Sequence, residues 1–227
     1  MATPALRWGS TNAYSEDSKG RNVYDWAILD SIFDTLVQVK AKPLVEIAFM
    51  SQALSVYPQP YRHQWPEGTL WAGWAYPPRH YHQWADLVYR WVRHVVERYG
   101  KEKVQSWKWE VWNEPDVGYW QGSWDEYYKL YDFAAEAVKR ALPQARVGGL
   151  DSTGPADPHA ADFLRKFLGH CAGGSNYATG AKGAPLDFVS FHATCNPKLV
   201  GDHVVMGSAA TCNRLTRGSA SFGPSPS

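Results

Sequence analysis

Segments with helical periodicity alternate with apolar runs of strand length, and this alternation constrains the fold more than any other feature of the sequence. In segment 80–99, apolar side chains recur every three or four residues, which predicts an amphipathic helix. Segment 43–50 is a mostly apolar run, typical of a strand buried on both faces of a parallel sheet. The alternation therefore predicts an α/β fold whose parallel strands are joined by right-handed helical crossovers. The predicted helices are 25–39, 80–99, 123–142 and 157–168, and the predicted strands are 43–50, 107–112, 145–150 and 186–192.

Two of the predicted helices carry start signals. Ser123 is followed three residues later by Glu126, which is the spacing of a capping box. Asp157 precedes Pro158, and this pair is typical of an N-cap followed by the first helical residue. Gly100 is expected to end the helix 80–99.

The segment 51–78 is a long loop rich in proline and aromatic residues. A loop of this size in a compact domain is usually functional. Its aromatic side chains allow two interpretations: they pack the loop against the domain, or they form a wall on which the apolar faces of a sugar stack. The aromatic residues concerned are Tyr57, Tyr61, Trp65, Trp71, Trp74 and Tyr76.

The composition excludes several classes of function. The chain has 23 Lys and Arg against 22 Asp and Glu, so it lacks the basic excess that nucleic-acid binding requires.

The sequence also lacks several recognisable motifs. No apolar run is long enough to predict a membrane span, and no Gly-rich phosphate loop supports a doubly wound nucleotide-binding sheet. The first ten residues lack the apolar core of a secretory signal, so we expect a cytoplasmic chain. The cysteines and histidines lack metal-binding spacing, so we expect reduced thiols, no metal and no other cofactor.

Polar residues follow all four predicted strands at corresponding positions. They are Ser51, the pair Asn113 and Glu114, Asp151, and His192. The carboxyl ends of parallel strands meet at one edge of a sheet, where α/β proteins bind their ligands. The sequence therefore predicts a site at this edge.

Glu114 is the strongest catalytic candidate at that edge. It follows a strand rich in tryptophan, and apolar surroundings raise the pKa of a carboxyl toward the range that suits a general acid. The alternative is a strand-end glutamate in an ordinary ion pair. Glu46 and Glu110 lie inside predicted strands, where we expect them to form structural ion pairs with basic residues such as Lys108. His192 alone is as typical of a structural histidine as of a ligand-binding one.

The segment 109–116, Trp-Glu-Val-Trp-Asn-Glu-Pro-Asp, resembles the Asn-Glu-Pro strand end of the retaining glycosidases that form the large (β/α)8-barrel clan. Further segments resemble glycoside hydrolase family 39, the β-xylosidase family, in the order of that family. The resemblance covers residues 14–206. The segments that carry it are 24–26, 42–50, 77–87, 98–100, 147–149 and 187–192.

The resemblance implies a partial (β/α)8 TIM-type barrel of about four βα units, which correspond to barrel strands three to six. Residues 1–206 would form this partial catalytic domain, and residues 207–227 an irregular tail. By resemblance, Glu114 matches the general acid/base, and Asn113 matches the residue that contacts the sugar hydroxyl beside the reacting carbon. His192 matches a sugar-binding histidine, and Trp112 of the same motif is taken as a further substrate contact. The implied substrate is a xylose-containing glycoside.

The sequence departs from the family pattern in one important way. The family's nucleophile is a glutamate at the end of the seventh barrel strand, whereas this sequence has no glutamate after Glu136. Thr194-Cys195 also stands where the family usually has Lys-Gly. We therefore expect a truncated copy, and two hypotheses stay open: a glycosidase of the β-xylosidase type, or an incomplete carbohydrate-binding chain. Glu46 is the first candidate for a hidden nucleophile.

Four βα units leave two sheet edges, whereas a closed barrel leaves none. The predicted edge strands 43–50 and 186–192 are apolar and lack the lysines that protect exposed edges. We therefore expect the chain to form a homo-oligomer through these edges.

Overall fold

The computed structural model describes residues 13–63, 70–71, 73–193 and 197–206. Four parallel strands form its central sheet, in the spatial order β3-β6-β7-β8. They are β3 (Leu44–Ile47), β6 (Lys108–Val111), β7 (Arg146–Ser152) and β8 (Phe188–Phe191). All four predicted strands are therefore confirmed, and the sheet is the parallel one that the alternation predicts.

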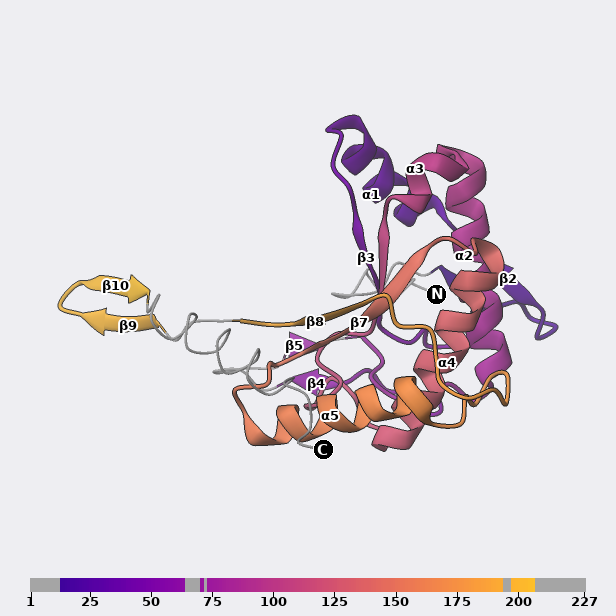
Figure 1. Ribbon diagram of the computed structural model, residues 1–227. Coiled ribbons are helices and arrows are strands. Elements are labelled where there is room, and N and C mark those ends of the chain that lie inside the picture. Colours follow the sequence, from indigo (N-terminus) through magenta and orange to yellow (C-terminus); the bar gives the residue numbers. More distant parts are fainter. Residues whose placement is uncertain (1–12, 64–69, 72, 194–196, 207–227) are drawn as a thin grey trace.

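One helix precedes β3, and the other helices connect successive strands of the central sheet (Figure 1). The helices are α1 (Ala27–Gln38), α2 (Tyr81–Tyr99), α3 (Lys101–Gln105), α4 (Trp124–Ala141) and α5 (Pro158–Gly173). The capping box is confirmed: Ser123 Oγ accepts a hydrogen bond from Glu126 N, and Ser123 N donates one to the Glu126 carboxylate. Gly100, with φ of 87°, ends α2 as predicted, but the short helix α3 begins directly after it.

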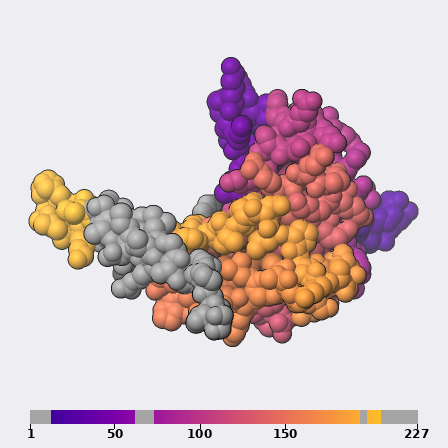
Figure 2. Space-filling model, in the orientation of Figure 1, coloured from indigo at the N-terminus to yellow at the C-terminus, as the bar shows by residue number. Residues whose placement is uncertain are grey.

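Three antiparallel strand pairs lie outside the central sheet and were not predicted. They are β1 (Tyr14–Glu16) with β2 (Asn22–Tyr24), β4 (Arg62–His63) with β5 (Leu70–Trp71), and β9 (Pro197–Val200) with β10 (His203–Met206). In Figure 2 the β9–β10 pair projects from the body of the molecule. Strands of two to four residues are too short to show a period of two in the sequence.

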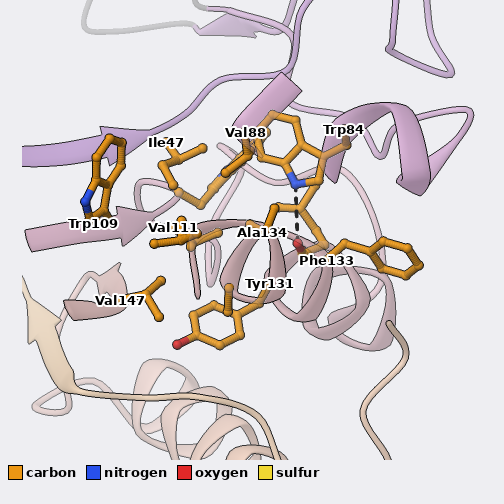
Figure 3. Packing of buried hydrophobic residues seen from close by; sticks show 14 of the residues in the cluster. Ile47, Trp84, Val88, Trp109, Val111, Tyr131, Phe133, Ala134 and Val147 are labelled. Atoms are coloured by element: carbon orange, nitrogen blue, oxygen red, sulfur yellow. Dashed lines mark hydrogen bonds between the residues drawn. The ribbon is translucent and has the colours of Figure 1, made fainter. Parts of the chain in front are cut away.

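The core lies between the sheet and the pair of helices α2 and α4 (Figure 3). Trp84 of α2 and Trp109 of β6 are almost fully buried there. The Trp84 indole N–H donates a hydrogen bond of 3.3 Å to the Leu130 carbonyl of α4, which satisfies its polar atom inside the core. The packing of α2 and α4 against the sheet therefore holds in place the strands whose ends carry the candidate site.

The sheet has two open edges within the described residues, β3 and β8. Leu44 on β3 is 53% exposed and Val189 on β8 is 39% exposed, so both edges present apolar side chains to solvent. This is the architecture of part of a (β/α)8 barrel. The predicted tail, 207–227, lies outside the described residues. No helix in the described part of the chain is both long enough and apolar enough to cross a membrane.

Candidate active site

Three of the predicted strand-end residues meet at the carboxyl edge of the sheet. Glu114 follows β6, Asp151 lies near the end of β7, and His192 follows β8. The Glu114 Oε1 atom lies 2.6 Å from His192 Nδ1. The other ring nitrogen, Nε2, lies 3.0 Å from the Asp151 carboxylate. The imidazole ring of His192 is therefore held between two carboxylates from two neighbouring strands.

The backbone at this edge adopts conformations that are uncommon for residues with side chains. Trp112, Glu114 and Asp151 have φ of 78°, 45° and 47°, all in the left-handed region. Such conformations persist only where surrounding contacts hold them, and they cluster at functional sites. Here Glu114 N donates to the Asp151 carbonyl at 2.9 Å, and His192 N donates to the Ser152 carbonyl at 2.7 Å. Hydrogen bonds between adjacent strand ends thus hold the backbone of Glu114 and of His192 in place.

The two carboxylates change the protonation of His192. Burial opposes the charged imidazole, but the hydrogen bond with Glu114 and the negative charge of Asp151 outweigh it, so the pKa of His192 is raised. The pKa of Asp151 is also raised, first because the carboxyl is buried. His192 acts in the opposite direction on Asp151, since a nearby positive charge favours the carboxylate.

Two further carboxyl groups lie behind this edge, on the strands themselves. Glu110 is buried and accepts a hydrogen bond from the Ser190 hydroxyl, and burial raises its pKa. Glu46 is solvent-accessible at the β3 edge, yet desolvation by the surrounding protein, Asp151 and Glu110 raise its pKa to about 7. Within the described residues neither glutamate forms an ion pair, so the expected structural pairs with basic residues are wrong; Lys108 only opposes the rise in the pKa of Glu110 through its positive charge. The Ser190 hydroxyl, which the sequence did not single out, is the partner of Glu110 instead.

Asn113 and Trp112, the other two predicted site residues of the motif, differ in burial and in hydrogen bonding. Asn113 is half-buried, and its side chain forms no hydrogen bond within the described part of the chain, which leaves its amide for a ligand. Trp112 is fully buried: its ring packs against Phe49 and Trp120, and its indole N–H donates to the Tyr119 carbonyl at 3.0 Å. The expected substrate contact by Trp112 therefore does not fit this structure, because the left-handed turn directs the ring into the core.

A second polar contact beside the site was not predicted. The Asp116 carboxylate accepts hydrogen bonds from the backbone N–H and the hydroxyl of Thr153. The Asp116 carbonyl lies 2.8 Å from Nε2 of His159, which lies in the first turn of α5. These contacts tie the turn after β6 to the turn after β7. Asp116 belongs to the motif segment, but nothing in its spacing indicates a partner 37 residues away.

The aromatic loop fits the packing interpretation at Trp74 and at Tyr61, whose ring packs edge-on against Tyr119 at 5.8 Å between centroids. Trp74 is buried, and its indole N–H donates to the Pro58 carbonyl at 3.1 Å. Tyr57 and Tyr76 instead pair at 4.8 Å between ring centroids, and Tyr57 is exposed. Trp65 lies outside the described residues. Among those that are described, no group of His, Cys, Asp and Glu has the geometry of a metal site.

Comparison with known proteins identifies the family. The family model of the glycosyl hydrolases family 39 matches residues 8–216. The chain belongs to this family. It is 36% identical over 179 residues to a β-xylosidase of Geobacillus stearothermophilus, covering 78% of this chain and 32% of that enzyme. It is 35% identical over 167 residues to a β-xylosidase of Caldicellulosiruptor saccharolyticus, covering 72% and 30%.

Solved structures agree with this assignment. The structure of a monomeric β-xylosidase from Caulobacter crescentus CB15 superposes with a TM-score of 0.70 at 27% identity, covering 92% of this chain and 40% of that chain. The resemblance to family 39 and the partial barrel are thus confirmed. The chain spans about a third of the length of these two curated β-xylosidases.

Proposed function

We propose that this chain carries the proton-transfer part of a retaining β-xylosidase-type site, with Glu114 as the general acid/base. The observation that supports this most directly is the position of Glu114: it follows β6, and its carboxylate lies 2.6 Å from the His192 ring. As a carboxylic acid, Glu114 protonates the glycosidic oxygen of the departing group. As a carboxylate, it then removes a proton from the water that releases the glycosyl-enzyme.

The proposed substrate is a xylose-containing glycoside, since the two curated relatives described above are β-xylosidases. Asn113 is proposed to donate its amide hydrogens to the sugar hydroxyl beside the reacting carbon. The His192 side chain is partly exposed at the carboxyl edge of the sheet, where it can contact the sugar. Neither role requires a metal or another cofactor.

The second candidate function is carbohydrate binding without turnover, and the carboxylate geometry favours it. A retaining mechanism needs two carboxyl groups about 5 Å apart, with the second acting as nucleophile. The carboxylate linked to Glu114 in this structure is Asp151, but the His192 ring lies between the two carboxylates. We therefore expect xyloside cleavage to be orders of magnitude slower than in a full-length relative, because acid and nucleophile act as a unit.

An aryl β-xyloside assay separates the two functions. We expect Glu114→Gln to lower any turnover by about 10²- to 10⁴-fold, the usual contribution of a general acid/base. The matched control is Glu97→Gln, since Glu97 is exposed on α2 and pairs only with Arg93 in the described residues. Equal turnover in both variants would refute the role of Glu114. Absence of turnover together with xylo-oligosaccharide binding, measured by calorimetry, would support the second function.

The identity of a nucleophile has its own test. If the chain turns over xyloside, each carboxyl facing the site is replaced by alanine, beginning with Glu46, and activity is measured with and without azide. Azide is a small anion that replaces a deleted carboxylate. Rescue of a Glu46→Ala variant alone would name Glu46 as the nucleophile, and loss of activity without rescue would exclude it.

We also propose that the chain self-associates through the β3 and β8 edges. Each edge carries unpaired backbone groups beside an exposed apolar side chain, Leu44 on β3 and Val189 on β8. Light scattering coupled to size-exclusion chromatography should show species larger than 25.5 kDa. Val189→Lys should shift the distribution toward the monomer, whereas a sharp monomer at all concentrations would refute the proposal.

A further inference from the structure

Asp151 contacts the acid/base centre by two routes. Its carboxylate lies 3.0 Å from His192 Nε2, while the opposite ring nitrogen lies 2.6 Å from Glu114. Its carbonyl accepts the hydrogen bond from Glu114 N at 2.9 Å. One residue of β7 thus contacts Glu114 directly through the backbone and indirectly through the His192 ring.

The arrangement restricts where protons reside. A neutral imidazole has one N–H, so one of its nitrogens would direct a lone pair at a carboxylate oxygen. That contact is repulsive unless a proton lies in it. Two protons must therefore be shared by Glu114, His192 and Asp151. The simplest arrangement is an imidazolium that donates a charge-assisted hydrogen bond from Nδ1 to Glu114 and forms an ion pair with Asp151 through Nε2.

Asp151 is itself held in place by its surroundings. Its backbone N–H donates to the Ser190 hydroxyl at 3.2 Å, and the same hydroxyl donates to Glu110. Its side chain is only 12% exposed, against 38% for His192. Its left-handed φ of 47° falls beside the register shift between β7 and β8, which re-aims the residues at this strand end. The geometry is that of a fixed support rather than of a mobile surface side chain.

We propose that Asp151 is a positioning residue of the acid/base centre: its carboxylate fixes the orientation and the positive charge of His192, and the His192 imidazolium in turn holds Glu114. This inference rests on the proposed role of Glu114. The negative charge of Asp151 favours protonated His192, whose Nδ1 then carries the hydrogen that is donated to the Glu114 carboxylate. In this way a residue that need not touch the sugar sets the position in which His192 holds the Glu114 carboxylate.

Four carboxyl groups face the His192 ring or its near surroundings. Glu114 and Asp151 contact it, and Glu110 on β6 and Glu46 on β3 act through their charge. Removal of the Asp151 charge alone leaves three of them, so any general effect of negative charge persists in an Asp151→Asn variant. The contact and the general field can therefore be separated by experiment.

The test measures the pKa of the His192 imidazole by ¹H–¹⁵N NMR over a pH titration, with its signal assigned from a His192→Gln variant. We expect Asp151→Asn to lower this pKa by about one unit or more, the usual effect of losing an opposite charge in contact. Asp151→Glu should restore part of the shift. Glu46→Gln is the control for the general field, and Asp162→Asn on the exposed face of α5 is the control for the substitution itself.

Two results would overturn the proposal. One is a His192 pKa that does not change in a folded Asp151→Asn variant, with folding checked by circular dichroism and cooperative unfolding. The other is a change of equal size in Glu46→Gln, which would assign the effect to the field. The titration needs no turnover, so it can succeed where xyloside hydrolysis fails. Where the chain does turn over, Asp151→Asn should also shift the pH profile of kcat/KM, which a purely structural role would not do.

Discussion

Replacement of Asp132 should lower the free energy of unfolding more than replacement of any exposed aspartate. Asp132 of α4 is fully buried, and both its carboxylate oxygens lie 3.0 Å from His170 Nε2 of α5. One oxygen also accepts a hydrogen bond of 2.7 Å from Tyr177 N. The His170 ring stacks between Tyr128 and Tyr177, so the contact joins α4, α5 and the loop that follows α5.

The magnitude follows from what Asp132→Ala leaves behind. The Tyr177 N–H and one nitrogen of His170 would both lose their partner, and each buried unpaired group costs about 1–3 kcal/mol. Burial raises the pKa of Asp132, so part of this cost is offset when the buried carboxyl is removed. We expect a net loss of about 3 kcal/mol in the free energy of unfolding, which corresponds to a fall of ~6–12 °C in Tm for a chain of this size.

Urea unfolding followed by tryptophan fluorescence measures this change. Asp162→Ala on α5 is the matched control, because Asp162 pairs only with exposed Arg165 and Lys166 among the described residues and should leave the urea midpoint unchanged. If Asp132→Ala fails to fold, Asp132→Asn keeps an acceptor for Tyr177 N and should lose about half as much. A loss below about 1 kcal/mol in Asp132→Ala would refute the argument that this buried contact joins the helices.

Three further predictions concern separate parts of the molecule. Ser123→Ala should destabilise the fold by about 1 kcal/mol in urea, because the cap of α4 is lost; an unchanged midpoint would contradict this. The pKa of Glu46 is raised from 4.5 to about 7, so the folded chain binds this proton more tightly than the unfolded chain. Stability from this group is therefore lost as the pH rises from 4.5 to 7, and Glu46→Gln should flatten that decline in urea midpoints. Burial raises the pKa of Cys171 to about 12, so iodoacetamide at pH 8 should label its peptide slowly in the native chain and rapidly in urea, as mass spectrometry would show; equal rates would contradict the burial.

The long elements of the fold were predictable because their patterns extend over several turns. The helix α2 presents apolar residues on one face across its whole length, and α4 adds a capping box to the same periodicity. The strands β3 and β6 were predictable as apolar runs between such helices. The β1–β2 and β9–β10 pairs were not, because strands of three or four residues leave no period to count.

The candidate site was predictable in its location but not in its contacts. Strand ends alone place Glu114, Asp151 and His192 at one edge of the sheet. The contact of both carboxylates with one imidazole depends on left-handed backbone at Glu114 and Asp151, and on the register shift between β7 and β8. Residue types do not encode these features, since non-glycine residues rarely adopt such conformations.

The buried contact between Asp132 and His170 was also not predictable from the sequence, although the helices that carry it were. Both residues lie on helices whose apolar pattern was recognised, and a pattern of apolar positions indicates nothing about a polar pair inside it. The partners are 38 residues apart on different helices. Only the packing of α4 against α5 brings them together, so the contact follows from the tertiary structure and not from local sequence.

The contacts that hold Glu114 lie within three adjacent strands, and this divides the proposed reaction into two parts. Glu114 follows β6, its hydrogen-bond acceptor Asp151 belongs to β7, and His192 follows β8. The first of these bonds joins the neighbouring strands β6 and β7, and the second reaches from the end of β6 to the end of β8, so the geometry of the acid/base group does not depend on a strand beyond β8. The nucleophile has the opposite requirement, because the family places it on the barrel strand that would pair with the open β8 edge. The position of Glu114 and the protonation of His192 should therefore change with substitutions within the sheet, whereas turnover should depend on the residues that pair with the open β8 edge.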